Sequence, residues 1–282
     1  MLLKLLPGGP FDDEAALNPL VKETLTKQWG LHESTLTQIV RYISSALRGD
    51  FGISMMHPDQ TVGSIIQQGL GSSLSLSLVT LLFVLLGAFS LALVSIRFRG
   101  TWFESLVDQT MIAMLSLPSL FWGPFLIYLF GFYFNVLPVA FLSSPIHYVL
   151  PVLTLGFRPL ATLVRLLKTS LNENLHLDYV RTAKAKGLGT WGILVHHVLR
   201  NSMIPFLSYA GPLITGLLSG SFLVEMLFAI PGLGSQFISS LNDRDYTLIV
   251  GLTLFYGAIL IIINSLMDVF MRLLDPRLTE DA

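Results

Sequence analysis

The 282-residue sequence contains no cysteine, few charged residues and no excess of basic residues. The absence of cysteine excludes disulfide frameworks, thiolate zinc sites and cysteine nucleophiles. Charged residues make up 12% of the chain, against about 25% in soluble globular proteins, so they are too sparse to cover a water-facing surface of this size. The formal net charge of −1 argues against nucleic-acid binding, which needs a basic footprint.

The sequence also lacks the short motifs of common catalytic sites. There is no G-x-x-x-x-G-K-[ST] phosphate-binding loop, and neither H-E-x-x-H nor G-x-S-x-G occurs. We therefore expect no catalytic residue in this chain and no cofactor or metal bound by it. The pair His196-His197 does not change this expectation, because adjacent residues on a helix point about 100° apart and chelate poorly.

Long apolar runs are abundant: 52% of the residues are hydrophobic, and the mean hydropathy is +0.68. A helix of about 20 apolar residues crosses the hydrocarbon core of a bilayer. Five windows meet this requirement, namely Ser72–Ile96, Val107–Phe130, Tyr148–Leu167, Met203–Phe228 and Leu248–Leu273. Prolines are tolerated in such spans where neighbouring helices bind the freed carbonyls, so Pro118 and Pro124 indicate kinks in a packed bundle. The expected fold class is all-α, a polytopic membrane helix bundle.

Basic residues alternate between the connecting loops. The turn after the first span is basic, the stretch 132–147 has neither lysine nor arginine, and the loop at about 168–202 is strongly basic. The next loop, 229–247, has a single arginine, and the tail is basic again. Because cytoplasmic loops carry the excess of lysine and arginine, we expect the 168–202 loop and the C-terminus inside and residues 1–71 outside.

Residues 1–71 form the first predicted region, ahead of a membrane domain at 72–277. This region has more acidic than basic residues, and Met1–Leu6 is too short for the apolar core of a signal peptide. Leu2–Gly8 reads like the last turn of a membrane helix that breaks into a loop. We therefore expect a sixth span upstream and an extracytoplasmic location for this region. Short helices are expected in it at Asn18–Trp29 and Ser34–Arg48.

The loop at 168–202 is the most informative stretch of the sequence. Asn172–Lys186 has the composition of a helix, and Gly187 is placed to end it in the left-handed conformation. Thr190 can cap a second helix that runs toward Arg200. The pattern predicts two short helices joined by a glycine turn and projecting from the bundle.

Apolar residues form a stripe on the first of these two helices. Leu175, Tyr179 and Ala183 recur at intervals of four residues and share one face. Such an amphipathic helix can dock in the groove of a partner protein, or it can lie on lipid headgroups as basic amphipathic helices do. Periodicity alone leaves both alternatives open.

The residues of this loop resemble those of a known family. Asp178-Tyr179-Val180-Arg181-Thr182-Ala183-Lys184-Ala185-Lys186-Gly187-Leu188, followed by His197-Val198-Leu199-Arg200-Asn201, resembles the cytoplasmic coupling loop of ABC-importer permeases, and more narrowly the dipeptide, oligopeptide and nickel branch. Arg181 stands where the family-wide EAA consensus has glutamate, a variation that is common in the peptide branch. Further matching strings are Leu6-Pro7-Gly8-Gly9-Pro10, Gly49-Asp50-Phe51-Gly52, Leu117-Pro118-Ser119, Ser219-Gly220-Ser221, Pro231-Gly232-Leu233-Gly234, Arg244-Asp245-Tyr246 and Leu274-Asp275-Pro276-Arg277.

The resemblance implies a permease subunit with the transmembrane fold of type I ABC importers. It implies that two cytoplasmic ATP-binding subunits hydrolyse ATP with Mg²⁺, and that a second, homologous permease completes a heterodimeric channel in the cytoplasmic (inner) membrane. An extracytoplasmic solute-binding protein would deliver a di- or oligopeptide or, in the alternative, nickel or another small solute. The implied contact with an ATP-binding subunit consists of Asp178, Tyr179, Arg181, Thr182, Ala183, Lys184, Ala185, Lys186 and Gly187.

Two ionisable residues within the spans are candidates for the transport path or its gate. Arg158 is near the middle of the third span, where a charge costs about 2.5–3.5 kcal/mol on insertion scales and by default faces a cavity or a partner. It either lines the path, where it could contact a substrate carboxylate, or pairs with an acid or with carbonyls freed by Pro159. Glu225, near the outer end of the fourth span, is a gate or docking carboxylate or an interfacial anchor.

Two other function classes remain as alternatives. A secondary transporter driven by an ion gradient would show inverted repeats and ionisable residues in its spans. Only Arg158, and marginally Glu225 and Asp268, qualify. An intramembrane enzyme would need paired acids or histidines at membrane depth, and the sequence offers none. Gly216 and Gly220 form a G-x-x-x-G pattern, which fits either a subunit contact or tight packing within the bundle.

Overall fold

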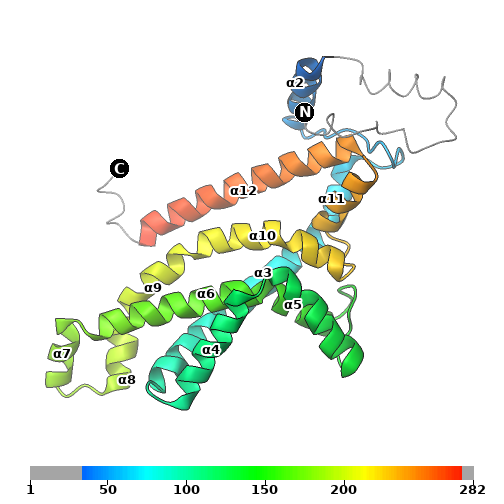
Figure 1. The fold of residues 1–282 in the computed structure, drawn as a ribbon. Helices are drawn as coiled ribbons and strands as arrows, with labels where there is room; N and C mark the ends of the chain where they lie inside the picture. The colour runs from blue at the N-terminus through cyan, green and yellow to red at the C-terminus, as the bar shows by residue number, and fades with distance from the viewer. Residues whose placement is uncertain (1–33, 275–282) are drawn as a thin grey trace, which may run out of the picture. The chain divides into compact units, whose positions relative to one another are not determined.

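The computed structural model of the chain describes residues 34–274. The helix expected at Asn18–Trp29, the Leu2–Gly8 string and Arg277 lie outside the described residues. Within residues 34–274 helices dominate and there is no strand, although an isolated bridge joins Ile53 to Thr61. Figure 1 shows the helices coloured in chain order.

The chain divides into two compact units, which are described separately. Among the described residues, the smaller unit contains 34–71 together with Pro231–Ala258, and the larger contains Ser72–Ile230 and 259–274. The smaller unit includes α2 (Thr35–Ala46), α11 (Leu233–Asn242) and the first parts of α3 (Val62–Arg97) and α12 (Tyr246–Leu274).

Asp245 organises the smaller unit. Its side chain is buried and accepts a hydrogen bond from the Ser54 hydroxyl. The backbone N–H groups of Met55, Met56 and Leu248 donate to the same carboxylate at 3.2, 3.3 and 3.0 Å. Leu248 lies in the first turn of α12, so one carboxylate both fixes the loop after α2 and caps a helix.

Tyr42 of α2 is the second polar residue that ties this unit together. Its hydroxyl lies 3.1 Å from the carbonyl oxygen of Phe51 and 3.2 Å from that of Thr247. Burial raises the pKa of Tyr42 above its usual range, and the negative charges of Asp245 and Asp50 act in the same direction. The hydroxyl therefore stays protonated and remains a donor.

The larger unit is built around α6 (Val149–Leu175), which packs against α4, α5, α9 and α10. The other elements of this unit are α4 (Trp102–Ser116), α5 (Ser119–Leu126), η2 (Ile127–Tyr133), η3 (Pro145–Tyr148), α7 (Asp178–Ala185), α8 (Thr190–Ile193), η4 (Leu194–Val198), α9 (Leu199–Ser208) and α10 (Ala210–Leu227).

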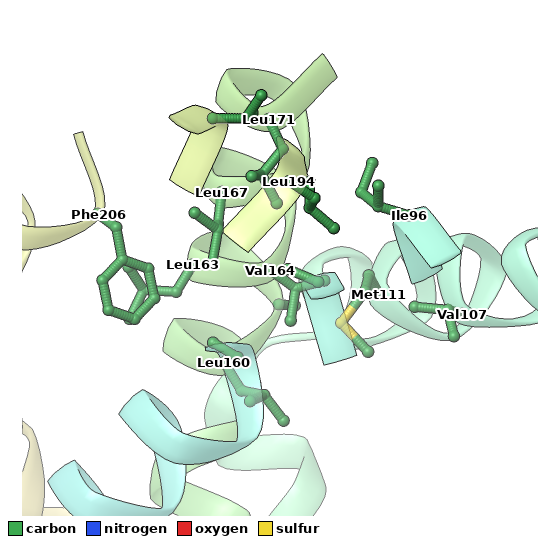
Figure 2. Packing of buried hydrophobic residues seen from close by; sticks show 14 of the residues in the cluster. Ile96, Val107, Met111, Leu160, Leu163, Val164, Leu167, Leu171, Leu194 and Phe206 are labelled. Atoms are coloured by element: carbon green, nitrogen blue, oxygen red, sulfur yellow. The ribbon is translucent and has the colours of Figure 1, made fainter. Parts of the chain in front are cut away.

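The core of the larger unit lies along α6. Figure 2 shows Leu160, Leu163, Val164, Leu167 and Leu171 of α6 with Ile96 of α3, Val107 and Met111 of α4, Leu194 of η4 and Phe206 of α9. Because lipid tails are as apolar as leucine, close packing rather than exclusion from water holds such helices together. Glycines permit the close approach: a Cβ added at Gly156 would lie 2.9 Å from the Phe83 ring, and one at Gly87 would lie 3.0 Å from Leu160.

Four helices of the described chain are long and apolar enough to cross a membrane, and one bent pair is a fifth candidate. The fifth predicted span agrees with α12 to within two residues at each end. Other boundaries differ: α3 begins at Val62, ten residues before the first predicted span, and α6 continues past Leu167 to Leu175. The fourth predicted span is divided at Tyr209 between α9 and α10.

The second predicted span, Val107–Phe130, is not one continuous helix. The sequence predicts kinks here, but the structure has a break, with α4 and α5 bent by 104° relative to each other. Leu117 and Pro118 between them are extended, with ψ of 139° and 140°. A proline disfavours the α conformation in the residue before it, which explains why α4 ends at Ser116. Pro124, by contrast, lies inside α5.

Candidate coupling helix and transport path

The predicted helix over Asn172–Lys186 is interrupted in the structure. α6 ends at Leu175, Leu177 is extended with ψ of 154°, and a separate helix, α7, begins at Asp178. An acidic residue in the first turn favours a helix start at this position, because it interacts with the positive end of the helix dipole. The prediction of one continuous helix was therefore wrong: the chain breaks between Leu175 and Asp178, and α7 is a separate helix.

The apolar side of α7 packs against its own chain. Val180 and Ala183 are buried in the cluster that contains Leu167 and Leu171 of α6, and Leu175 and Tyr179 pack against that cluster. The stripe of Leu175, Tyr179 and Ala183 is thus not available to a partner's groove or to lipid headgroups. The stripe holds α7 on the bundle. Docking of α7 in a partner's groove, or its position on lipid headgroups, stays a prediction.

The opposite side of α7 is exposed and polar. Arg181 forms an ion pair with Asp178 at 3.4 Å, and such an exposed pair adds little to stability. Of the nine residues expected to contact an ATP-binding subunit, seven are exposed, Tyr179 is partly buried and Ala183 is buried. The exposed ones are Asp178, Arg181, Thr182, Lys184, Ala185, Lys186 and Gly187.

Gly187 ends α7 in the left-handed conformation, as the sequence predicts, with φ of +80°. The N–H of Gly187 donates to the carbonyl of Lys184 at 2.9 Å, and the N–H of Leu188 donates to the carbonyl of Ala183 at 3.3 Å. This pair of bonds is the Schellman arrangement. A Cβ at Gly187 would meet no atom within 4 Å, so backbone conformation and not space is what requires glycine here.

The helix after the turn is not a short one ending near Arg200. α8 begins at Thr190 and is followed without a gap by η4 and α9. The residues from Trp191 to Leu227 together form one of the candidate membrane spans. The segment after the turn is therefore the beginning of the fourth span, and the projecting part of the loop is α7 with its glycine turn.

Arg158 is exposed on α6 and lines a cavity of about 250 Å³. Thr162, Tyr209 and Gly216 line the same cavity. Within residues 34–274 no acidic side chain forms an ion pair with Arg158, so the alternative of a structural pair with an acid finds no support there. A Cβ at Gly216 would meet nothing within 4 Å, which contradicts tight internal packing as the reason for this glycine.

Glu225 is fully buried in α10. It accepts a hydrogen bond of 2.8 Å from the hydroxyl of Ser73 in α3. This carboxylate connects two helices of the larger unit, and within that unit it is not exposed to solvent. A role of Glu225 in a gate stays a prediction.

Lys168 of α6 is a buried charge that the sequence analysis did not single out. Its ammonium lies 2.5 Å from Asp108 and 3.3 Å from Glu104, both on α4. The sequence does contain a lysine at the end of the third predicted span and two acidic residues about sixty positions before it. Only the fold shows that their side chains are in contact. The three charges link α4 to α6.

Comparison with known proteins identifies the family. Residues 84–280 match the model of the binding-protein-dependent transport system inner membrane component. The chain belongs to this family. It is 36% identical to the dipeptide transport system permease protein DppB of Bacillus subtilis, over 99% of this chain and 90% of that protein. It is 32% identical to the oligopeptide transport system permease protein OppB of Haemophilus influenzae, over 98% of this chain and 91% of that protein.

Solved structures with this fold include members of two ABC transporters. One is an amino acid ABC transporter, with a TM-score of 0.59 and 16% identity over 74% of this chain and 94% of the solved chain. The other is the inward-facing MetNI methionine ABC transporter, with a TM-score of 0.60 and 14% identity over 75% of this chain and 96% of the solved chain. The binding-protein-dependent permease is thus a multi-pass membrane protein with the fold of ABC importer transmembrane domains.

Proposed function

We propose that the chain is one of two permease subunits of an ATP-driven importer that moves di- or oligopeptides across the cytoplasmic membrane. The names of its relatives support peptides as the solute, since DppB and OppB permeases align with nearly the whole chain. An external binding protein delivers the peptide, and a second, homologous permease completes the channel. ATP and Mg²⁺ are bound and used by two cytoplasmic subunits and not by this chain.

The geometry of α7 supports the role of a coupling helix. Val180 and Ala183 fix one side of α7 to the bundle, and the other side presents Arg181, Lys184 and Lys186 to solvent. A short helix held firmly on one side and exposed on the other can transmit the movement of a bound ATPase to the spans. On this proposal α7 and the C-terminus lie on the cytoplasmic side, in agreement with the basic loops.

We place Arg158 in the transport path because it is a membrane-depth charge that faces a cavity of about 250 Å³. The buried hydrogen bond between Ser73 and Glu225 supports a gating role, in which α10 and α3 move apart or together. It argues against direct contact of Glu225 with the binding protein. Both assignments concern the solute path and are independent of the coupling contact at α7.

The proposal is tested by uptake into proteoliposomes that contain the complete assembly purified through a tag on this chain. Peptide uptake should require ATP in the vesicle lumen, which corresponds to the cytoplasm. Vanadate should stop this uptake. Uptake that continues without ATP and stops when an ionophore collapses the ion gradient would instead establish the alternative of a secondary transporter. Nickel in place of the peptide tests the remaining alternative solute in the same vesicles.

A further inference from the structure

The exposed side of α6 has a composition opposite to that of a lipid-facing surface. Between Leu150 and Leu175 the exposed residues are Arg158, Arg165, Thr169 and Glu173, and all four are polar. On α3, by contrast, the exposed residues between Leu74 and Leu86 are all apolar; they are Leu74, Leu78, Val79, Leu82 and Leu86. Arg158 lies near the middle of the third predicted span, where a charge is unfavourable against lipid, so this part of the exposed side of α6 faces water or protein. Thr169 and Glu173 continue the same face into the loop that is expected on the cytoplasmic side.

The polar residues of α6 form one continuous stripe. Arg158, Thr162, Arg165, Thr169 and Glu173 are spaced by three or four residues, which places them on one face of a helix. The two arginines are seven residues apart, or about 10 Å along the axis. We call these five residues the α6 stripe.

Hollows follow this stripe along its length. Thr162, which lines the cavity at Arg158, also lines a second cavity of about 460 Å³ together with Arg165, Thr169 and Glu173. A third, of about 380 Å³, is lined by Arg165 and Thr169 on one side and by the α4 residues Glu104 and Asp108 on the other. Neighbouring hollows share stripe residues, so together they mark a groove that follows α6.

The guanidinium groups of the stripe have no ion-pair partner within the described chain. Neither Arg158 nor Arg165 forms a salt bridge with any residue between 34 and 274. The nearby carboxylates Glu104 and Asp108 pair with Lys168 instead. Glu173, the acidic residue of the stripe, lies eight residues from Arg165, or about 12 Å along the axis. The part of the groove between Arg158 and Arg165 therefore presents two positive charges that are available to an anion.

We propose that the α6 stripe is a wall of the solute path and that Arg158 and Arg165 bind the carboxylate of the transported peptide one after the other. The inference rests on the proposed function, because it takes a peptide as the solute. A guanidinium binds a carboxylate through two parallel hydrogen bonds. These bonds offset the hydration that the carboxylate loses when it leaves bulk water. Two sites about 10 Å apart let the anion move on without being held too tightly at either one.

The absence of cysteine makes a direct test possible. Single cysteines are introduced as Thr162→Cys and Thr169→Cys on the stripe, and as Leu78→Cys on the apolar side of α3 as the control. The complete assembly in proteoliposomes is treated with a negatively and a positively charged methanethiosulfonate, and modification of this chain is measured by mass. For each cysteine, the rate with the anionic reagent is divided by the rate with the cationic reagent. This ratio is then divided by the same ratio measured for a small thiol in solution.

The stripe cysteines should react, and the control at Leu78 should not. At Thr162→Cys, which lies between the two guanidinium groups, the normalised ratio of anionic to cationic reagent should rise about fivefold at low salt. At Thr169→Cys, which lies between Arg165 and Glu173, the rise should be smaller. The double variant R158Q/R165Q should return the ratio to that of the free thiol, and R158K/R165K should keep it raised. Unreactive stripe cysteines would place the stripe in a subunit contact and overturn the proposal, as would a ratio that the neutral variants leave unchanged.

Transport separates this inference from the proposed function. If the wild-type assembly takes up no peptide, the proposed function fails, while the labelling still reports whether the groove is aqueous and positive. If wild type transports, R158Q/R165Q should lower uptake of a free peptide at least tenfold, and R158K/R165K should lower it less. Arg99→Gln, a basic residue outside the stripe, is the control and should leave uptake unchanged. Equal uptake by R158Q/R165Q and wild type would contradict the proposal.

Discussion

At the scale of single residues, Gly187 sets the direction of the chain after α7. Its φ of +80° is a conformation that side chains with a Cβ disfavour by about 1–2 kcal/mol. Gly100, in the turn between α3 and α4, has φ of +78° and is equally free of neighbours. The two glycines are thus matched in backbone conformation and in the free space around a Cβ, but only Gly187 adjoins the proposed coupling surface. The N–H of Gly100 donates to the carboxylate of Glu104 at 2.8 Å.

Replacing Gly187 by valine should leave the protein inserted and assembled but abolish peptide-stimulated ATP hydrolysis. The strained turn would shift the end of α7, whereas asparagine, which tolerates the left-handed region, should retain most of the coupling. Gly100→Val is the control with the same backbone strain. ATPase activity of purified assemblies with and without peptide is the measurement, and full coupling in Gly187→Val would count against the lever role of α7.

Asp245 supports a second prediction at this scale. Replacing it by alanine leaves the Ser54 hydroxyl and several backbone N–H groups of the smaller unit without their acceptor. A buried donor left unsatisfied costs about 1–3 kcal/mol, so the variant should unfold at a lower temperature than wild type. Asp243→Ala is the control, because Asp243 is exposed and, within the described part of the chain, its carboxylate accepts a hydrogen bond from Ser239 alone. Thermal unfolding in detergent measures both, and equal losses would disprove the special role of Asp245.

At the scale of helices, α7 shows what sequence patterns reveal and where they stop. The loop composition and the position of Gly187 were sufficient to predict a helix and a left-handed end. The pattern of Leu175, Tyr179 and Ala183 also identified a buried face, but it did not identify what buries that face. That distinction depends on how α6 ends at Leu175, and the sequence has no proline or glycine there to reveal the break.

The link between α4 and α6 can be tested as a unit. Lys168→Met leaves Glu104 and Asp108 close together without their cation. The loss of stability should be about 2 kcal/mol, which is less than for a fully buried ion pair because Asp108 is half exposed. The triple variant K168M/E104Q/D108N removes all three charges and should recover much of the loss. Thermal unfolding of the two variants and wild type is the comparison. If Lys168 acts only through the packing of its aliphatic stem, Lys168→Met should unfold at nearly the same temperature as wild type, and the triple variant should bring no recovery.

At the scale of the whole molecule, the apolar windows and the alternation of basic loops were enough to predict an all-α membrane bundle, and the motif strings were enough to predict the family. The positions of helix breaks were harder to predict. Pro118 breaks a span while Pro124 lies inside α5, and the presence of a proline alone does not distinguish the two outcomes. The α6 stripe cannot be recognised from the sequence alone, because which side of α6 is buried and which is exposed depends on tertiary packing.

The central claim is that the exposed face of α7 binds an ATP-hydrolysing subunit. The most direct test is a cross-link from the single cysteine of Lys184→Cys, labelled with a photoactivatable thiol reagent in native membranes and identified by mass spectrometry. We expect an adduct with the nucleotide-binding subunit. An adduct with an extracytoplasmic protein, or no adduct with the ATPase in an assembly that transports peptide, would contradict it.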